Sequence, residues 1–178
     1  MRIIAGQFKG RRFHPPADNW PTRPTTDFAK EGLFNILENR LDFENLVALD
    51  LFGGTGNHCF ELISRGARKV TYVDKHRPAV LFVKKLATEL KIEAQITIIN
   101  GDVRRFLLHP AIQFDYIFAG PPYPLPWIPE IPDLIFDHGW LNTNGLFVLE
   151  TNPQHRFDQH PRFRELRTYG KTHFSFFS

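Results

Sequence analysis

The chain has very little cysteine and no long apolar run, and both absences narrow the class of protein. Its single cysteine, Cys59, excludes an internal disulfide, and no Cys and His cluster has zinc-ligand spacing. No apolar run approaches the roughly 20 residues that cross a bilayer. The first residues carry charge every few positions and do not resemble a signal peptide. We therefore expect a cytoplasmic protein with no metal site and no membrane partner.

The chain also lacks a strong net charge, which is only +3, but its N-terminal part is basic. Residues 1–23 contain one acidic residue and five basic ones, namely Arg2, Lys9, Arg11, Arg12 and Arg23. A local excess of positive charge indicates a polyanionic partner such as a nucleic acid. A solvated cluster of surface charges is the alternative, and the charges alone do not decide between the two.

From residue 46 onward, short apolar runs alternate with amphipathic stretches. The apolar runs predict strands in VALDLFG, KVTYVD, QITIING, FDYIFAG and GLFVLET, and the stretches between them predict helices in NHCFELISRGA, RPAVLFVKKLATELK, VRRFLLH and WIPEIPDLIFDHGWL. Strands that are apolar throughout and joined by helices form parallel sheets covered on both faces. The tail, FRELRTYGKTHFSFFS, predicts two strands joined by a tight turn. The prediction is an α/β fold with a doubly wound, mostly parallel seven-stranded sheet that ends in an antiparallel hairpin.

The first 40 residues have a different pattern. RIIAGQFKGRRFH predicts a β-hairpin, and TTDFAKEGLFNILENRL predicts an amphipathic helix capped by Thr25 or Thr26. We therefore divide the chain into an N-terminal hairpin and helix, residues 1–40, and a main domain, residues 41–178. A chain of 178 residues requires no further domain, and we expect a monomer.

Ligands of open α/β sheets bind beyond the carboxyl ends of the strands, so those ends hold the candidate site. The first strand ends in LDLFGGTGN, whose Gly53, Gly54 and Gly56 would let main-chain amides approach a ligand closely. This turn lacks the Gly-Lys-Ser/Thr of a P-loop, which disfavours a nucleoside triphosphate. It also lacks the third glycine of the dinucleotide fingerprint, which disfavours a dehydrogenase.

Two aspartates follow the next two strands. Asp74 ends the second strand, where a carboxylate can bind both hydroxyls of a ribose. Asp102 follows the third strand, where it could accept a hydrogen bond from an adenine amine. Each has an alternative role as a helix cap, and Asp102 is well placed for it. With the glycine turn, the two aspartates indicate a nucleoside pocket.

The fourth strand ends in Gly120, Pro121, Pro122 and Tyr123. Two prolines make a rigid turn without amide donors, and the tyrosine ring offers an aromatic face beside main-chain carbonyls. A base flipped out of its stack could lie on that ring while carbonyls accept from its exocyclic amine. A strand-terminating loop with no chemical role would have the same prolines, and only the neighbouring nucleoside pocket favours the functional interpretation.

These segments resemble the bacterial 16S rRNA guanine-N2 methyltransferases, of the class I S-adenosylmethionine-dependent superfamily with its Rossmann-like fold. The resemblance covers nearly the whole chain and is most specific in RIIAGQFKGRRF and RPTTDFAKEGLFNIL. It implies that 16S rRNA or the small ribosomal subunit is the partner. The implied donor site consists of Asp50, Phe52, Gly53, Gly54, Gly56, Asp74 and Asp102. The implied acceptor site consists of Gly120, Pro121, Pro122 and Tyr123, and the implied RNA contacts are Lys9, Arg11, Arg12 and Arg23.

Three positions depart from the pattern of that family. Gly120 stands where the family has Asp or Asn, whose side chain accepts a hydrogen bond from the target amine. Phe28 stands where the family usually has Arg, and His58 lies in a stretch where small apolar residues are usual; we interpret it as a structural histidine. Main-chain carbonyls, an ordered water or Glu150 at the end of the fifth strand could supply the acceptor missing at Gly120.

Other functions stay open at this point. The pocket could accept a different base or amine, because Pro-Pro-aromatic turns also suit methyltransferases of DNA or protein. Alternatively, the chain could bind its cofactor and RNA without methylating. Of these, we favour an S-adenosylmethionine-dependent RNA methyltransferase of reduced or altered efficiency, because the donor-site features and the Pro-Pro-Tyr turn are all present.

Overall fold

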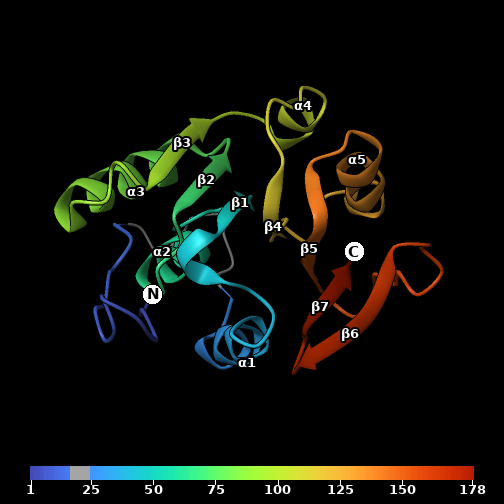
Figure 1. The fold of residues 1–178 in the computed structure, drawn as a ribbon, viewed down its shortest axis with the longest axis horizontal. Coiled ribbons are helices and arrows are strands. Elements are labelled where there is room, and N and C mark those ends of the chain that lie inside the picture. Colours follow the sequence, from blue (N-terminus) through green and yellow to red (C-terminus); the bar gives the residue numbers. More distant parts are fainter. Residues whose placement is uncertain (17–24) are drawn as a thin grey trace.

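One seven-stranded sheet organises the protein. The structure, a computed structural model, describes residues 1–16 and 25–178. The strands are β1 (Val47–Leu51), β2 (Lys69–Asp74), β3 (Ile96–Asn100), β4 (Phe114–Ala119), β5 (Leu141–Thr151), β6 (Phe163–Tyr169) and β7 (Thr172–Phe177). Their order in the sheet is β3-β2-β1-β4-β5-β7-β6. The first five strands are parallel and β7 is antiparallel to β5 and β6, which confirms the predicted sheet (Figure 1).

Helices cover both faces of this sheet. The helices are α1 (Asp27–Leu37), α2 (Asn57–Ser64), α3 (Arg77–Leu90), α4 (Val103–Leu107) and α5 (Ile131–Asp137), with short 3-10 helices η1 (Phe43–Asn45) and η2 (Ile128–Glu130). Helices α1, α2 and α3 share one buried core, and α4 and α5 share the other (Figure 1). Alternate residues of β4 enter the two cores, as a strand covered on both faces requires. In the described part of the chain, no helix is long and apolar enough to cross a membrane.

Local signals account for most element ends. The Thr26 side chain accepts a hydrogen bond from the Ala29 amide at 3.2 Å, so Thr26, one of the two predicted caps, begins α1. The last helix is shorter than its predicted stretch, because α5 stops at Asp137 and a left-handed Gly139 follows. Strand β5 then begins at Leu141, earlier than its apolar run suggests, and its pairing with β4 is irregular there.

The predicted N-terminal hairpin has two short limbs. Main-chain hydrogen bonds across it join Met1 to Phe13 and join Ile3 to both Arg11 and Gly10. A single antiparallel bridge joins Arg2 to Arg12. The amides of Ile4 and Ala5 instead donate to the Glu61 carboxylate of α2, at 2.8 and 3.0 Å. The segment is therefore fixed to α2 as well as joined across its own two limbs.

Candidate active site

The carboxyl ends of the parallel strands surround a cavity of about 480 Å³. Nearly all the candidate donor and acceptor residues line it, although they come from separate parts of the chain: Asp50, Phe52, Gly53, Gly54, Asp74, Asp102, Gly120, Pro121, Pro122 and Tyr123. No group of three or more His, Cys, Asp or Glu within residues 1–16 and 25–178 is arranged to hold a metal ion. The arrangement instead offers one wall of carboxylates and glycines and one wall of prolines and aromatic rings.

The turn after β1 is tight and partly left-handed. Phe52, Gly54 and Gly56 have φ angles of 59°, 52° and 78°. A non-glycine residue in this conformation is uncommon, and Phe52 places its ring 5.7 Å from that of Trp127 across the cavity mouth. Gly56 does not line the cavity: it caps α2, and a Cβ there would lie 2.6 Å from the Phe60 ring. The start of α2 thus explains why a glycine stands at position 56.

Asp50 is the most deeply buried acid of the cavity wall. Its Oδ2 accepts a hydrogen bond from the Cys59 amide at 3.1 Å, whereas its Oδ1 has no partner in the described part of the chain. Burial raises the pKa of Asp50 to about 8, and the charges of Asp74 and Glu150 act in the same direction. A cationic ligand group beside Oδ1 would satisfy this acceptor and favour the ionised form.

Asp74 and Asp102 are both held by main-chain amides. The Asp74 carboxylate accepts from the His76 amide at 2.7 Å and from the Gly54 amide at 2.8 Å, which ties the end of β2 to the glycine turn. Asp102 caps α4 by accepting from the Arg105 amide at 3.0 Å, so its interpretation as a helix cap is confirmed. Both carboxylates also line the cavity, where hydroxyl or amine donors of a ligand can reach them.

The turn from Gly120 to Tyr123 forms another part of the cavity lining. A Cβ built on Gly120 would meet only the Phe118 ring, at 3.3 Å, so a side chain needs only a small shift of that ring. The turn is closed by the Leu125 amide, which donates to the Pro122 carbonyl at 2.9 Å. Tyr123 is half-buried, and its hydroxyl lies 3.5 Å from Oε1 of Glu150, at the long limit of a hydrogen bond.

Several cavity residues were outside the predicted site, including Thr25, His58 and Trp127, whereas Glu150, which was considered as a substitute acceptor, does line the cavity. His58 stacks on Phe118 with ring centroids 3.8 Å apart, and its Nε2 is 3.1 Å from the Tyr116 hydroxyl. Burial lowers the pKa of His58 well below its ordinary value, so the ring is neutral. Its interpretation as a structural histidine agrees with these contacts, while its edge contributes to the cavity wall.

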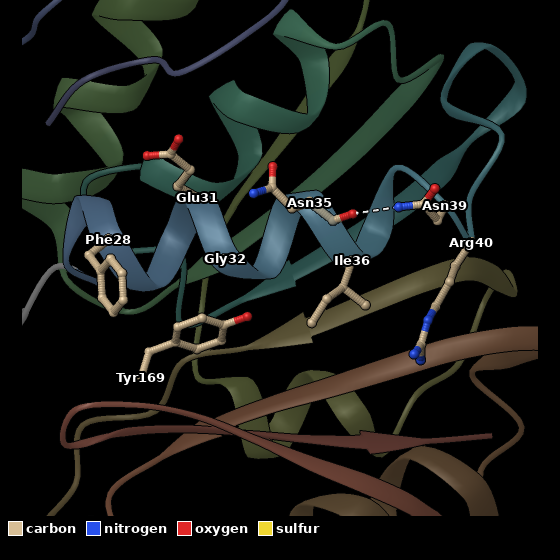
Figure 2. Close-up of a pocket in the computed structure, with 8 residues that line it drawn as sticks. All are labelled: Phe28, Glu31, Gly32, Asn35, Ile36, Asn39, Arg40 and Tyr169. Carbon is tan, nitrogen blue, oxygen red and sulfur yellow. Dashed lines mark hydrogen bonds between the residues drawn. The ribbon is translucent and has the colours of Figure 1, made fainter.

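Phe28 lies outside this cavity, in a separate groove between α1 and the turn of the β6–β7 hairpin (Figure 2). Its side chain is 70% exposed, and its ring meets the Tyr169 ring edge-on at 5.7 Å. Figure 2 shows the two rings side by side at one end of the groove. The departure at Phe28 therefore changes the surface beside α1 and leaves the cavity wall unaltered.

The basic residues of the N-terminal segment lie on the surface. Lys9, Arg11 and Arg12 are exposed, and Arg12 lines a shallow hollow that also includes Thr25 and Asn57. Those last two residues line the main cavity as well. The basic segment thus adjoins the cavity. Arg23, the fourth predicted RNA contact, is outside the described residues.

Comparison with known proteins identifies the family. All 178 residues match the family described as conserved hypothetical protein 95. The ribosomal RNA small subunit methyltransferase D of Haemophilus influenzae is 35% identical over 154 residues, covering 85% of this chain and 78% of that protein.

Two solved structures have the same fold. The Thermus thermophilus hypothetical protein TTHA0928 has a TM-score of 0.85 and 24% identity, covering 100% of this chain and 99% of its own. The Thermus thermophilus 16S rRNA N2 G1207 methyltransferase, solved with AdoMet and guanosine, has a TM-score of 0.68 and 22% identity, covering 86% of this chain and 43% of its own.

The strand order, the cavity at the carboxyl ends and these matches agree with the resemblance recognised in the sequence. The likeness to the two solved structures shows the fold, and the family match over the full chain shows the evolutionary relationship. The chain therefore belongs to the conserved hypothetical protein 95 family, that of the bacterial small-subunit ribosomal RNA methyltransferases D, and has the class I methyltransferase fold.

Proposed function

We propose that this protein transfers a methyl group from S-adenosylmethionine to the exocyclic N2 amine of a guanine in 16S ribosomal RNA. One observation carries the proposal: a single cavity includes both the glycine turn with its acidic residues and the turn from Gly120 to Tyr123. A donor held at the first turn would face a base held at the second. Such a transfer depends mainly on aligning the amine with the methyl group, so a preformed cavity can supply much of the rate acceleration.

The chemistry of the residues at the donor end of the cavity suits S-adenosylmethionine. Asp74 would take the ribose hydroxyls and Asp102 the adenine amine, while the Gly53 and Gly54 backbone allows close approach. The unpartnered Oδ1 of Asp50 suits the cationic methionine end of the molecule. When bound, the donor supplies an electrophilic methyl group on a positively charged sulfur.

The acceptor end fits a flat base with an exocyclic amine. The Tyr123 ring offers a stacking surface, and the two prolines before it contribute carbonyl acceptors and no amide donors of their own. The Pro122 carbonyl already accepts from the Leu125 amide and has one lone pair left for a base. Extruding a base to such a surface costs a few kcal/mol, least for a base that is already unpaired.

The choice of 16S rRNA has two supports. The relative from Haemophilus influenzae is named as a small-subunit ribosomal RNA methyltransferase. In addition, the exposed Lys9, Arg11 and Arg12 belong to a segment that adjoins the cavity, where they would contact phosphates around the target nucleotide. This substrate corresponds to a cytoplasmic site of action.

The test is transfer of labelled methyl from S-adenosylmethionine to small ribosomal subunits that lack native guanine-N2 methylation. DNA and bulk protein serve as competing substrates in parallel reactions. We expect label in 16S rRNA alone, mapped by mass spectrometry to the N2 amine of one guanine. The Gly120→Asp variant is run alongside, since position 120 has room for the side chain.

The other outcomes separate the remaining functions. Label in DNA or protein would replace the substrate proposed here. A wild type that is inactive on all three substrates, while Gly120→Asp methylates the RNA, would contradict the proposal. The protein would then be an RNA-binding module that retains a methyl-donor fold.

A further inference from the structure

We infer that Glu150 is a catalytic residue that accepts a hydrogen bond from the target amine and then takes its proton. The inference rests on the proposed function, because it concerns the acceptor end of the same cavity. Its starting point is Gly120, which provides no side-chain acceptor beside the turn where the base would stack. Glu150 also lines the cavity, and its carboxylate accepts from the Tyr123 hydroxyl at 3.5 Å.

The register of the sheet places Glu150 at the level of Gly120. Ala119 of β4 pairs with Leu149 of the parallel strand β5, so the next residues along the two strands are Gly120 and Glu150. Neighbouring strands lie about 4.8 Å apart. A carboxylate on β5 can therefore reach a ligand group that lies next to Gly120.

The Glu150 carboxylate is buried and oriented. The residue is 6% exposed, and its Oε2 accepts a hydrogen bond from the Thr25 hydroxyl at 2.5 Å. Its Oε1 is 3.5 Å from the hydroxyl of Tyr123, the ring on which the base would stack. A carboxylate offers about four acceptor positions, so it can accept from several donors at once, an amine among them. Strand β5 continues to Thr151 and gives the side chain a rigid base.

Position 120 can take a side chain if the Phe118 ring shifts by a few tenths of an ångström. An added Cβ would meet only the Phe118 ring, at 3.3 and 3.8 Å. This room makes an exchange experiment possible, in which a carboxylate is removed from one strand and supplied from its neighbour.

The chemical step balances with Glu150 as the base. The lone pair of N2 forms a bond to the methyl carbon, while the carbon–sulfur bond breaks and its electron pair stays on sulfur. The nitrogen becomes positively charged and loses one proton to Glu150, which returns it to solvent after the product leaves. A hydrogen bond from the amine to the carboxylate before transfer also turns the nitrogen lone pair toward the methyl group.

The principal test is the Glu150→Gln variant, which keeps the shape of the side chain and can still accept from Thr25. In single-turnover transfer to small ribosomal subunits, we expect the rate to fall about 100-fold or more, as when one oriented donor is removed from an oxyanion hole. The KM for subunits and the Kd for S-adenosylmethionine should stay within about threefold of wild type, as expected for a group that acts mainly in the transition state. Glu93→Gln, a matched change at an exposed position, should have the wild-type rate.

The exchange variant separates catalysis from folding. Adding Gly120→Asp to Glu150→Gln should restore at least about tenfold of the lost rate, because it returns a carboxylate to the amine. A Glu150→Gln protein with the wild-type rate overturns this inference and leaves the proposed function intact. Loss of donor binding without rescue by Gly120→Asp would make Glu150 a structural residue and also overturn it. A wild type inactive on every substrate removes the proposed function and this inference together.

Discussion

At the scale of single residues, the burial of Asp50 in the cavity wall lowers the folding stability of the ligand-free protein above about pH 4. Burial raises the pKa of Asp50 from 3.8 to about 8. Between these values the folded protein holds a proton that the unfolded chain has already lost. Stability therefore falls as the pH rises from about 4 to about 8, because the unfolded state binds fewer protons. The stability that the protonated Asp50 contributes is fully present below about pH 4 and is lost above about pH 8.

Asp50→Asn removes this dependence and should stabilise the ligand-free protein at high pH. Each pKa unit corresponds to about 1.4 kcal/mol, so the gain at pH 9 relative to pH 4 has an upper limit of about 5 kcal/mol. Urea unfolding of both proteins across this pH range measures it. Asp137→Asn, at an exposed position, serves as the control. It should change the difference in the free energy of unfolding between pH 4 and pH 9 by less than about 0.5 kcal/mol. Equal curves for wild type and Asp50→Asn would show that Asp50 ionises normally in the folded protein.

The site residues differ in how far the sequence could predict them. Asp74 was a candidate because it ends an apolar run, and strand ends meet at one edge of a parallel sheet, whereas Asp50 was implied only by the resemblance to the family. Their binding roles stay predictions, but their convergence on one cavity follows from the fold. Gly56 belonged to the same motif, yet it lies outside the cavity because its left-handed backbone begins α2. A motif alone does not distinguish a glycine needed by a ligand from one needed by a helix.

At the scale of elements, a buried ion pair joins the N-terminal segment, α1 and α2. The Lys30 ammonium is 3.1 Å from Oε2 of Glu61, and the two side chains are 1% and 0% exposed. Lys30 also donates to the Arg2 carbonyl at 2.5 Å and to the Asn57 side chain at 2.8 Å. Burial lowers the pKa of Lys30, while the charge of Glu61 raises it. The pair holds the basic segment beside the cavity, since Asn57 lines both.

Glu61→Gln should therefore destabilise the protein by about 3–5 kcal/mol, because it leaves the Lys30 charge buried without its partner. The matched control is Glu89→Gln, which removes one member of the exposed Lys85–Glu89 pair on α3 and should cost less than about 1 kcal/mol. Chemical denaturation at pH 7 measures both changes. If the two variants are equally stable, the buried pair does not hold these elements together.

This junction could not be predicted from the sequence. Lys30 and Glu61 lie in amphipathic helices, where charged residues are normally assigned to the solvent face. The sequence likewise does not reveal that two amides in the first limb of the hairpin, those of Ile4 and Ala5, donate to Glu61. Periodicity identifies which segments are helical or extended, but not which buried charge they share.

At the scale of the whole molecule, the alternation of apolar runs and helices was enough to predict a parallel sheet covered on both faces. The strand order and register were not accessible, since many orders satisfy the same alternation. The register matters here because it sets Gly120 of one strand beside Glu150 of the next. When a motif lacks a residue with the required chemistry, a residue on the neighbouring strand can thus supply it.

The charge distribution of the whole molecule leads to a prediction on RNA binding. Lys9, Arg11 and Arg12 are exposed on the N-terminal segment, and Arg12 lines the hollow beside the cavity, whereas Lys84, Lys85 and Lys91 form an equally charged exposed set on and just after α3. Replacing all three N-terminal cations with Gln should weaken binding to 16S rRNA at every salt concentration. It should also lower the slope of log affinity against log salt by about 2 to 3, because each lost phosphate contact removes about 0.7 to 0.9.

Filter binding at several salt concentrations measures the slopes for the wild type and the variant. The control is the triple Gln variant of the α3 set, which has the same net charge as the N-terminal variant. If RNA binding depended only on overall charge, the two triple variants would lose affinity equally. A specific contact surface requires the N-terminal variant to lose most of the salt dependence while the α3 variant keeps it. Since Lys9, Arg11 and Arg12 lie outside the cavity, the N-terminal variant should bind S-adenosylmethionine like wild type. Its methyl transfer should recover at saturating RNA, because phosphate contacts position the substrate without contacting the reacting amine.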